Sequence, residues 1–122
     1  SRFFEIWRHN GELDGVRVLS PHAVARARVA QNSGLRPDGI MKVPVRFGLG
    51  VMLGSRQFSL FGPDTENAFG HLGFTNILGW TDPDREISVG FLNNGKPFIA
   101  PEQVAWLSIP RTISQHFPPT RR

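Results

Sequence analysis

The chain has 122 residues, of which 39% are hydrophobic and 20% are charged, with a formal net charge of +4 and no cysteine. This length allows at most one domain, and the composition is that of a folded globular protein rather than a disordered one, with no apolar run long enough to span a bilayer. The absence of cysteine excludes disulfides, thiolate metal sites and a cysteine nucleophile.

The positive charge is spread along the whole chain. Arginines occur from Arg2 to Arg111 without forming a block, and only Arg121 and Arg122 stand together. This spread is typical of a solvated, mildly basic surface, whereas nucleic-acid binders gather basic residues into a patch. We therefore expect no nucleic-acid partner, and a non-catalytic basic binding module is kept as an alternative.

The first element is predicted to be a short amphipathic helix over residues 3–9, ending at Asn10-Gly11. Its apolar side consists of Phe3, Phe4, Ile6 and Trp7. Because so much apolar surface has to be covered, and because the chain begins with Ser1, we expect a further segment upstream.

Turn and cap signals follow. Asp14-Gly15 between apolar flanks predicts a hairpin within residues 12–19. Ser20 as N-cap and Pro21 at the first helical position predict a helix over residues 21–31. A loop over residues 34–44 then leads to a glycine-rich strand over residues 45–53 and a polar, turn-rich segment up to residue 68.

The second half of the chain predicts two strands, 76–81 and 87–92. They are joined at Asp82-Pro83-Asp84-Arg85, and this sequence is typical of a turn rather than of a catalytic pair of carboxylates. A helix is expected from Pro101 through residues 103–107, with a kink at Pro110 and a frayed tail. The predicted class is α+β, with three antiparallel strands flanked by helices. The apolar residues on both faces of strands 76–81 and 87–92 predict cover on both sides, which needs more helices than this chain has.

The segment 69–74 reads Phe-Gly-His-Leu-Gly-Phe, so that His71 and Gly73 lie just ahead of the strand 76–81. A His-x-Gly at a strand edge resembles the last motif of the β-lactamase-like serine hydrolases, a family that includes penicillin-binding proteins and esterases. In that family the motif is often Lys-Thr-Gly and lines the substrate cleft. Residues 11–21 and 47–50 resemble the segments that precede this motif.

The resemblance implies that residues 1–122 are the C-terminal segment of one β-lactamase-like domain. It implies that His71 sets the electrostatics around the nucleophile, that Gly73 leaves room for substrate, and that the Phe74 N–H is half of an oxyanion hole. Leu72, Phe74 and Asn76 are the implied substrate-binding residues. Family members carry small residues where this chain has Phe74 and Asn76, so we expect a narrower cleft.

The nucleophilic machinery of the family is missing from this sequence. The chain contains no Tyr, and none of its serines is followed by Lys at the third position. The implied partner is therefore an N-terminal segment of the same enzyme that carries Ser-x-x-Lys and Tyr. The four histidines, at positions 9, 22, 71 and 116, do not have metal-ligand spacing, so we expect no metal and no other cofactor.

These observations favour a carboxylesterase that hydrolyses a small-molecule ester through an acyl-enzyme. A neutral His offers less positive charge than Lys for holding a substrate carboxylate. A β-lactamase or a D-Ala-D-Ala peptidase-like enzyme is the second hypothesis, and Lys at position 71 would have favoured it.

Overall fold

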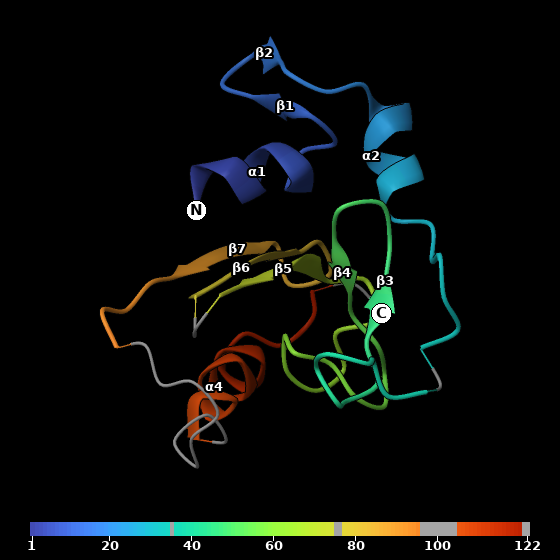
Figure 1. Cartoon of the computed structure of the whole chain (residues 1–122). Helices are drawn as coiled ribbons and strands as arrows, with labels where there is room; N and C mark the ends of the chain where they lie inside the picture. Colours follow the sequence, from blue (N-terminus) through green and yellow to red (C-terminus); the bar gives the residue numbers. More distant parts are fainter. Residues whose placement is uncertain (35, 75–76, 96–104, 121–122) are drawn as a thin grey trace.

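Figure 1 shows the computed structural model of the chain, which describes residues 1–34, 36–74, 77–95 and 105–120. The described helices are α1 (Arg2–Arg8), α2 (Pro21–Ala27) and α4 (Ser108–His116). The described strands are β1 (Glu12–Leu13), β2 (Val16–Arg17), β3 (Arg46–Phe47), β4 (Met52–Leu53), β5 (Phe69–Gly73), β6 (Ile77–Asp82) and β7 (Ile87–Phe91). The predicted α+β class is confirmed.

One antiparallel sheet organises the molecule, with the strand order β3-β4-β5-β6-β7. The β1–β2 hairpin forms a separate pair. Helix α1, this hairpin and α2 lie on one face of the sheet, and α4 lies on the other (Figure 1). The central strands thus have helices on both faces, as their apolar residues predict, and these helices belong to this chain itself.

Local signals in the first third of the chain act as predicted. Asp14 and Gly15 both have positive φ angles, 51° and 78°, which is the type I′ geometry of a tight hairpin. The Ser20 hydroxyl accepts a hydrogen bond from the Ala23 N–H at 3.1 Å and caps α2. Helix α2 ends at Ala27 rather than at residue 31, because the following chain bonds to the β3–β4 hairpin through the Gln31 N–H and the Phe47 carbonyl, 2.7 Å apart.

Helix α1 lies directly on β6 and β7. Gly79 and Gly90 are cross-strand partners in these two strands. A Cβ atom on Gly79 would lie 2.2 Å from Cε2 of Phe4, so the Phe4 ring occupies the space that a side chain would need. A Cβ atom on Gly90 would lie 3.6 Å from the Ser1 nitrogen, which is an ordinary contact. The helix can therefore approach the backbone of β6 only because residue 79 is glycine.

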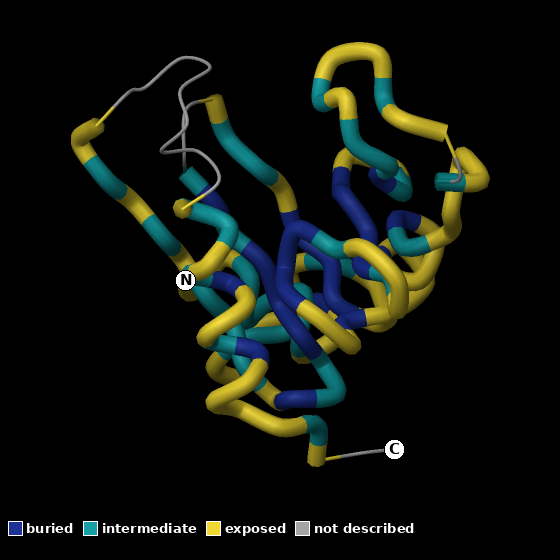
Figure 2. Tube along the Cα trace, turned by 90° about the horizontal axis from the view of Figure 1, so that it is seen from below, coloured by how far each residue is buried: buried dark blue, intermediate teal, exposed yellow. Residues whose placement is uncertain are grey.

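The larger hydrophobic core lies on the opposite face of the sheet, where α4 contributes Ile113. Its buried members are Val45, Met52, Leu60, Phe61, Ala68, Leu78 and Trp80. The rings of Phe61 and Trp80 stack with centroids 6.0 Å apart. Buried segments gather in the centre of the trace, and exposed ones form its periphery (Figure 2). A smaller cluster of Val51, Leu53 and Phe69 packs against Trp7 of α1.

A buried ion pair closes the β6–β7 connection. Arg85 and Asp82 are 2.9 Å apart, with side-chain exposures of 3% and 1%. The same guanidinium also donates to three carbonyl groups, those of Pro63, Asp64 and Ser114. Burial raises the pKa of Asp82, and the hydrogen bonds from Arg85 oppose that rise. The turn chemistry expected at this position is confirmed, since Asp82 also accepts from the backbone N–H of Asp84 at 3.1 Å.

The prediction of one strand over residues 45–53 is wrong. The segment forms the hairpin of β3 and β4, in which Phe47 pairs with Met52. Gly50 has a φ of 72°, which lets the chain reverse there. A Cβ atom on Gly48 would lie 2.0 Å from the Ala27 carbonyl oxygen, so this glycine permits the close approach of the segment after α2.

The placement of the His-x-Gly motif ahead of a strand is also wrong. His71 and Gly73 lie within β5, which pairs with β6 along its whole length. The sheet therefore has five strands rather than three. The glycines at 70 and 73 disguise this strand in the sequence, because glycine lowers strand propensity and the pairing with β6 decides the conformation.

The C-terminal part also differs from the prediction. Residues 101–104 of the predicted helix lie outside the described residues, whereas Ala105 and Trp106 are helical. Pro110 lies in the first turn of α4, where a missing N–H costs no helical hydrogen bond. The tail is not frayed up to Thr120, whose N–H and hydroxyl both donate to the Asp84 carbonyl, at 2.7 and 3.0 Å.

We expect Arg85→Met to reduce the free energy of unfolding by about 3–5 kcal/mol, because the variant leaves the Asp82 carboxylate buried without its partner. The double variant Asp82→Asn/Arg85→Met should recover part of this loss. The control Arg56→Met, at an ion pair whose Arg side chain is 78% exposed, should cost less than about 1 kcal/mol. Urea unfolding measures all three, and an equal loss in both single variants would contradict the assignment.

Candidate active-site strand

Strand β5 carries the His-x-Gly motif at a partly open edge. On one side β5 pairs with β6 over all of its residues. On the other side β4 pairs only with Phe69 and Gly70. Within the described residues, no strand lies beside the outer edge of β5 from His71 to Gly73. An open strand edge of this kind offers main-chain N–H and C=O groups to a ligand or to another segment.

The side chains of β5 alternate between the two faces of the sheet. Phe69 packs against Trp7 on the α1 face, with ring centroids 6.0 Å apart. Leu72 packs against the large core on the α4 face. His71 therefore belongs to the α1 face, where it is exposed. The motif thus places an imidazole on the surface and anchors its neighbour Leu72 in the core.

The hydrogen bond of His71 identifies its tautomer. Nδ1 lies 2.7 Å from the carbonyl oxygen of Leu72. Because a carbonyl oxygen only accepts hydrogen bonds, Nδ1 must carry the proton. Nε2 of the neutral ring is then an acceptor, and it becomes a donor when the ring is protonated. Nδ1 is therefore held by this hydrogen bond, and Nε2 is the nitrogen that can hydrogen-bond to a ligand.

The other motif residues occupy different settings. A Cβ atom on Gly73 would lie 3.3 Å from Cβ of Ile77, so even a methyl group is crowded there. Phe74 follows the strand with 77% of its side chain exposed. Asn76, expected as a substrate-binding residue, lies outside the described residues. His71, Gly73 and Phe74 thus lie near one another at the end of β5, whereas the Leu72 side chain packs against the core.

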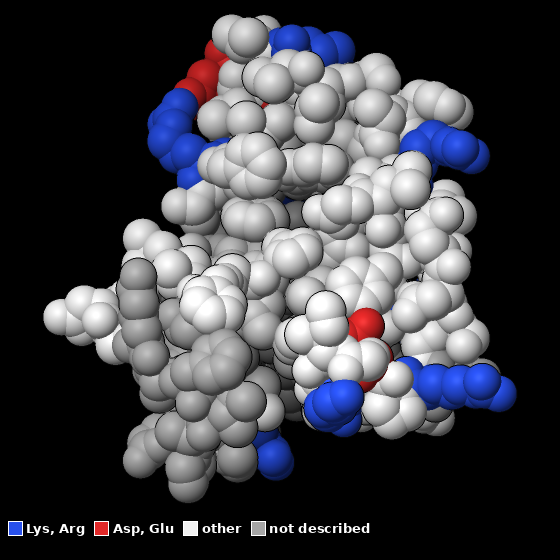
Figure 3. Space-filling view, viewed as in Figure 1, with Lys and Arg blue, Asp and Glu red and all other residues white. Residues whose placement is uncertain are grey.

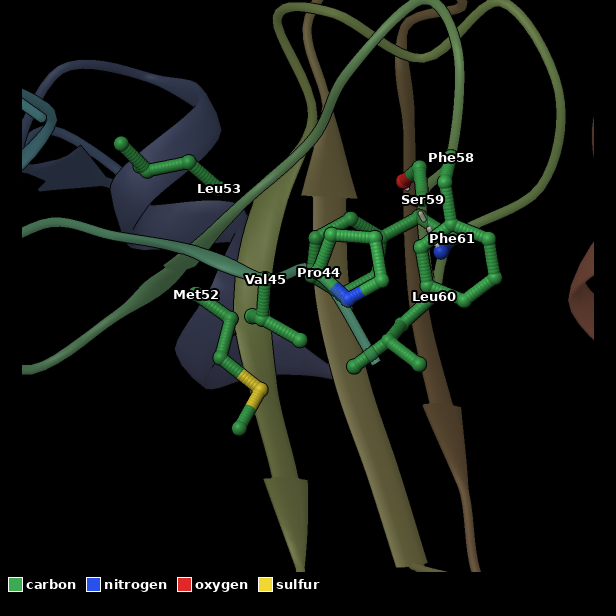
Figure 4. A pocket seen from close by; sticks show the side chains of 8 residues that line it. All are labelled: Pro44, Val45, Met52, Leu53, Phe58, Ser59, Leu60 and Phe61. Carbon is green, nitrogen blue, oxygen red and sulfur yellow. Dashed lines mark hydrogen bonds between the residues drawn. The ribbon is translucent and has the colours of Figure 1, made fainter. Parts of the chain in front are cut away.

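One cavity of the described part is too small for a substrate. One apolar cavity has a volume of about 10 Å³, and Figure 4 shows side chains such as Pro44, Met52 and Phe61 lining it. Such a space holds at most one water molecule, whereas ligand sites have several hundred Å³. A second, open hollow beside the β1–β2 hairpin is lined by His9, Glu12, Leu13 and Asp14. Neither space is lined by residues of the His71 strand.

Some of the charged residues form ion pairs. The arginines in ion pairs with carboxylates are Arg2, Arg8, Arg17, Arg56 and Arg85. In Figure 3 the blue Lys and Arg side chains lie at separate points around the rim of the visible face. The hydrogen bond from Arg8 holds the pKa of the Glu5 carboxyl below its usual range. This distribution does not favour a basic binding patch.

Two further observations concern metals and membranes. Within the described ranges, no three His, Cys, Asp or Glu side chains converge in a way that would hold a metal ion. Among the described helices, none has the length and apolar character needed to cross a bilayer.

Sequence reasoning missed two features of this site. The first is the contact of Phe4 with Gly79, the strand partner of His71. Its only sequence signal is a glycine inside each of two neighbouring strands, which marks close backbone approach. The second is the burial of Arg85, for which the turn sequence carries no signal.

Comparisons with known proteins agree with the resemblance to the β-lactamase-like family. The family model described as Beta-lactamase matches residues 1–112. The chain is 28% identical over 120 residues to Esterase/beta-lactamase LipL of Mycobacterium tuberculosis, a match that covers 94% of this chain and 26% of that protein.

Two solved structures resemble the fold. A penicillin-binding protein homolog from Caulobacter crescentus matches with a TM-score of 0.66 and 27% identity, over 78% of this chain and 24% of that one. A family VIII carboxylesterase matches with a TM-score of 0.66 and 25% identity, over 90% of this chain and 29% of that one. The chain thus spans about a quarter of the length of these relatives. Because the family model covers almost all of its residues, the chain belongs to the Beta-lactamase family.

Proposed function

We propose that this chain is the C-terminal segment of a serine hydrolase, and that the complete enzyme is a carboxylesterase working through an acyl-enzyme. The observation that carries the proposal is the exposed imidazole of His71 on a strand whose outer edge is open from His71 to Gly73. Relatives in the same family are named as an esterase/β-lactamase and a carboxylesterase. His rather than Lys at this position favours an uncharged ester over a substrate carboxylate.

An N-terminal segment of the same enzyme, carrying Ser-x-x-Lys and Tyr, is the proposed partner. Two observations support it: the chain spans about a quarter of its relatives, and β7 has no described strand on its outer side. The residues of β7 are mostly half-buried rather than charged, so this edge suits another strand. We call this chain together with that segment the assembled enzyme, so that residues 1–122 form part of one domain.

In the proposed reaction the partner's serine oxygen attacks the ester carbonyl carbon after passing its proton to the partner's Lys–Tyr pair. The alcohol leaves with that proton, and water then hydrolyses the acyl-serine. The Phe74 N–H would stabilise the oxyanion of each tetrahedral intermediate. Nε2 of His71 would hydrogen-bond to the alcohol part, Gly73 would admit the substrate, and the Leu72 main chain and Asn76 would hold it.

A β-lactamase or a D-Ala-D-Ala peptidase-like activity is the second candidate. The words esterase/β-lactamase in one relative's name and a penicillin-binding protein homolog among the structures favour keeping it. Both reactions use the same acyl-enzyme, so substrate comparison on one preparation decides between them. Faster turnover of a neutral short-chain ester than of a β-lactam or D-Ala-D-Ala peptide supports the esterase.

A fluorophosphonate probe should label the partner segment of the assembled enzyme and leave this chain unlabelled, because no serine here has a Lys that could activate it. The variant Ser20→Ala should keep full labelling, although loss of the α2 cap costs about 1 kcal/mol of stability. Intact mass spectrometry of both segments measures the labelling. A covalent adduct on any serine of residues 1–122 would contradict the proposal.

His71→Ala should lower kcat for a short-chain ester at least about a hundredfold in the assembled enzyme. Because the His71 side chain is exposed, the free energy of unfolding should change by less than about 0.5 kcal/mol. His22→Ala, at an exposed histidine of α2, is the matched control and should change neither quantity. Unchanged turnover in His71→Ala would remove this residue from the site.

The oxyanion role of Phe74 can be tested with two substitutions at one position. Phe74→Pro removes the N–H and should lower kcat about a hundredfold to a thousandfold. Phe74→Ala keeps the N–H and removes only a ring that is 77% exposed, so most of the activity should remain. Steady-state kinetics on both variants, with melting temperatures as a folding check, separate the two effects. Equal activity of the two variants would show that this N–H does not stabilise the oxyanion.

A further inference from the structure

The residue that pairs with His71 on the neighbouring strand has no side chain. His71 of β5 pairs with Gly79 of β6. The side chains of such a pair lie on the same face, with Cβ atoms about 4.5–5.5 Å apart, and they normally restrict each other. Because residue 79 is glycine, the strand itself provides nothing beside the imidazole on its β6 side.

A residue from α1 fills this position. A Cβ atom on Gly79 would lie 2.2 Å from Cε2 of Phe4, and 3.0 Å from its Cδ2 and Cζ atoms. The ring of Phe4 therefore occupies the volume that a side chain at residue 79 would take. Its neighbours on α1 hold it there, since Phe3 packs edge-on against it with ring centroids 5.2 Å apart. Trp7 anchors the same helix to Phe69 on β5.

The imidazole of His71 turns away from this filled position. Its Nδ1 donates to the Leu72 carbonyl on its own strand, at 2.7 Å. The outer edge of β5 beyond Gly70 carries no described strand, so this is the side on which the ring has space. A side chain with one direction blocked and one nitrogen hydrogen-bonded has few remaining rotamers.

We propose that Phe4 is a positioning residue for His71, which it keeps at the open edge of β5 by filling the cross-strand place that Gly79 leaves empty. This inference rests on the proposed function of His71. Phe4 itself touches no reacting atom and acts only through the imidazole. A histidine displaced by about 1 Å can lose two orders of magnitude in rate, so such positioning has a measurable effect.

Three variants of the assembled enzyme test the proposal. Phe4→Ala empties the cross-strand place, Gly79→Ala forces the ring out of it, and Phe4→Ala/Gly79→Ala refills it partly with a methyl group on the strand. Gly90→Ala is the matched control, because a Cβ atom there lies 3.6 Å from its nearest neighbour, the nitrogen of Ser1 at the N-cap of the same helix. Leu78→Ala is the control for lost stability alone, since Leu78 is buried in the core on the other face.

Two readouts are needed. Kinetics per active site, counted with the fluorophosphonate probe, should show kcat lowered about tenfold to a hundredfold in both single variants, with KM nearly unchanged and partial recovery in the double variant. NMR of the labelled His71 ring should show a smaller share of the Nδ1-protonated tautomer in Phe4→Ala. Gly90→Ala and Leu78→Ala should leave both readouts unchanged. Phe4→Leu replaces Phe4→Ala if the latter does not fold.

Unchanged kcat and an unchanged tautomer in Phe4→Ala, or an equal loss of kcat in Leu78→Ala, would overturn the positioning role. The tautomer measurement does not depend on catalysis. A tautomer change in Phe4→Ala together with full activity of His71→Ala would support the influence of Phe4 on His71 and refute the proposed function. Loss of activity in His71→Ala with no effect of Phe4→Ala would support the proposed function of His71 and refute the positioning role of Phe4.

Discussion

The buried ion pair of Asp82 and Arg85 joins parts of the chain that are far apart in sequence. It lies at the turn between β6 and β7, and the same guanidinium reaches the carbonyls of residues 63 and 64 and of Ser114 in α4. Desolvating a charge is costly, so such a group is tolerated only when each donor has an acceptor. The pair therefore fixes how the turn, the 54–68 segment and the last helix meet, and with them the large core beneath β5 and β6.

The two faces of the sheet differ in what they carry. Its α4 face is packed with apolar side chains around Phe61 and Trp80, which makes the strands rigid. Its α1 face carries Gly79 and Gly90, the helix α1 and the exposed His71. An imidazole held on a strand that is anchored on its other face keeps its position better than one on a loop.

The open edges of the sheet give the proposed assembly its physical basis. The outer side of β7 and the outer edge of β5 beyond Gly70 both lack a described strand, and Phe3 is 61% exposed. Unpaired main-chain groups and apolar surface favour association with further chain. In the proposed enzyme the β7 edge receives a strand and the β5 edge receives the substrate, so that one sheet serves folding at one side and catalysis at the other.

The sequence by itself determined the features that depend on near neighbours. Asp14-Gly15 specifies the hairpin and Ser20-Pro21 starts α2, because turn geometry and capping are local. The resemblance to the β-lactamase-like family was also visible in the sequence, and the family match confirms it. Only the tertiary structure decided that residues 45–53 form a hairpin, that the motif lies inside β5, and that Phe4 fills the place of a side chain at Gly79. Glycine-rich segments have little conformational preference of their own, so their conformation is set by strands and helices distant in sequence. The amino-acid sequence alone does not reveal those pairings.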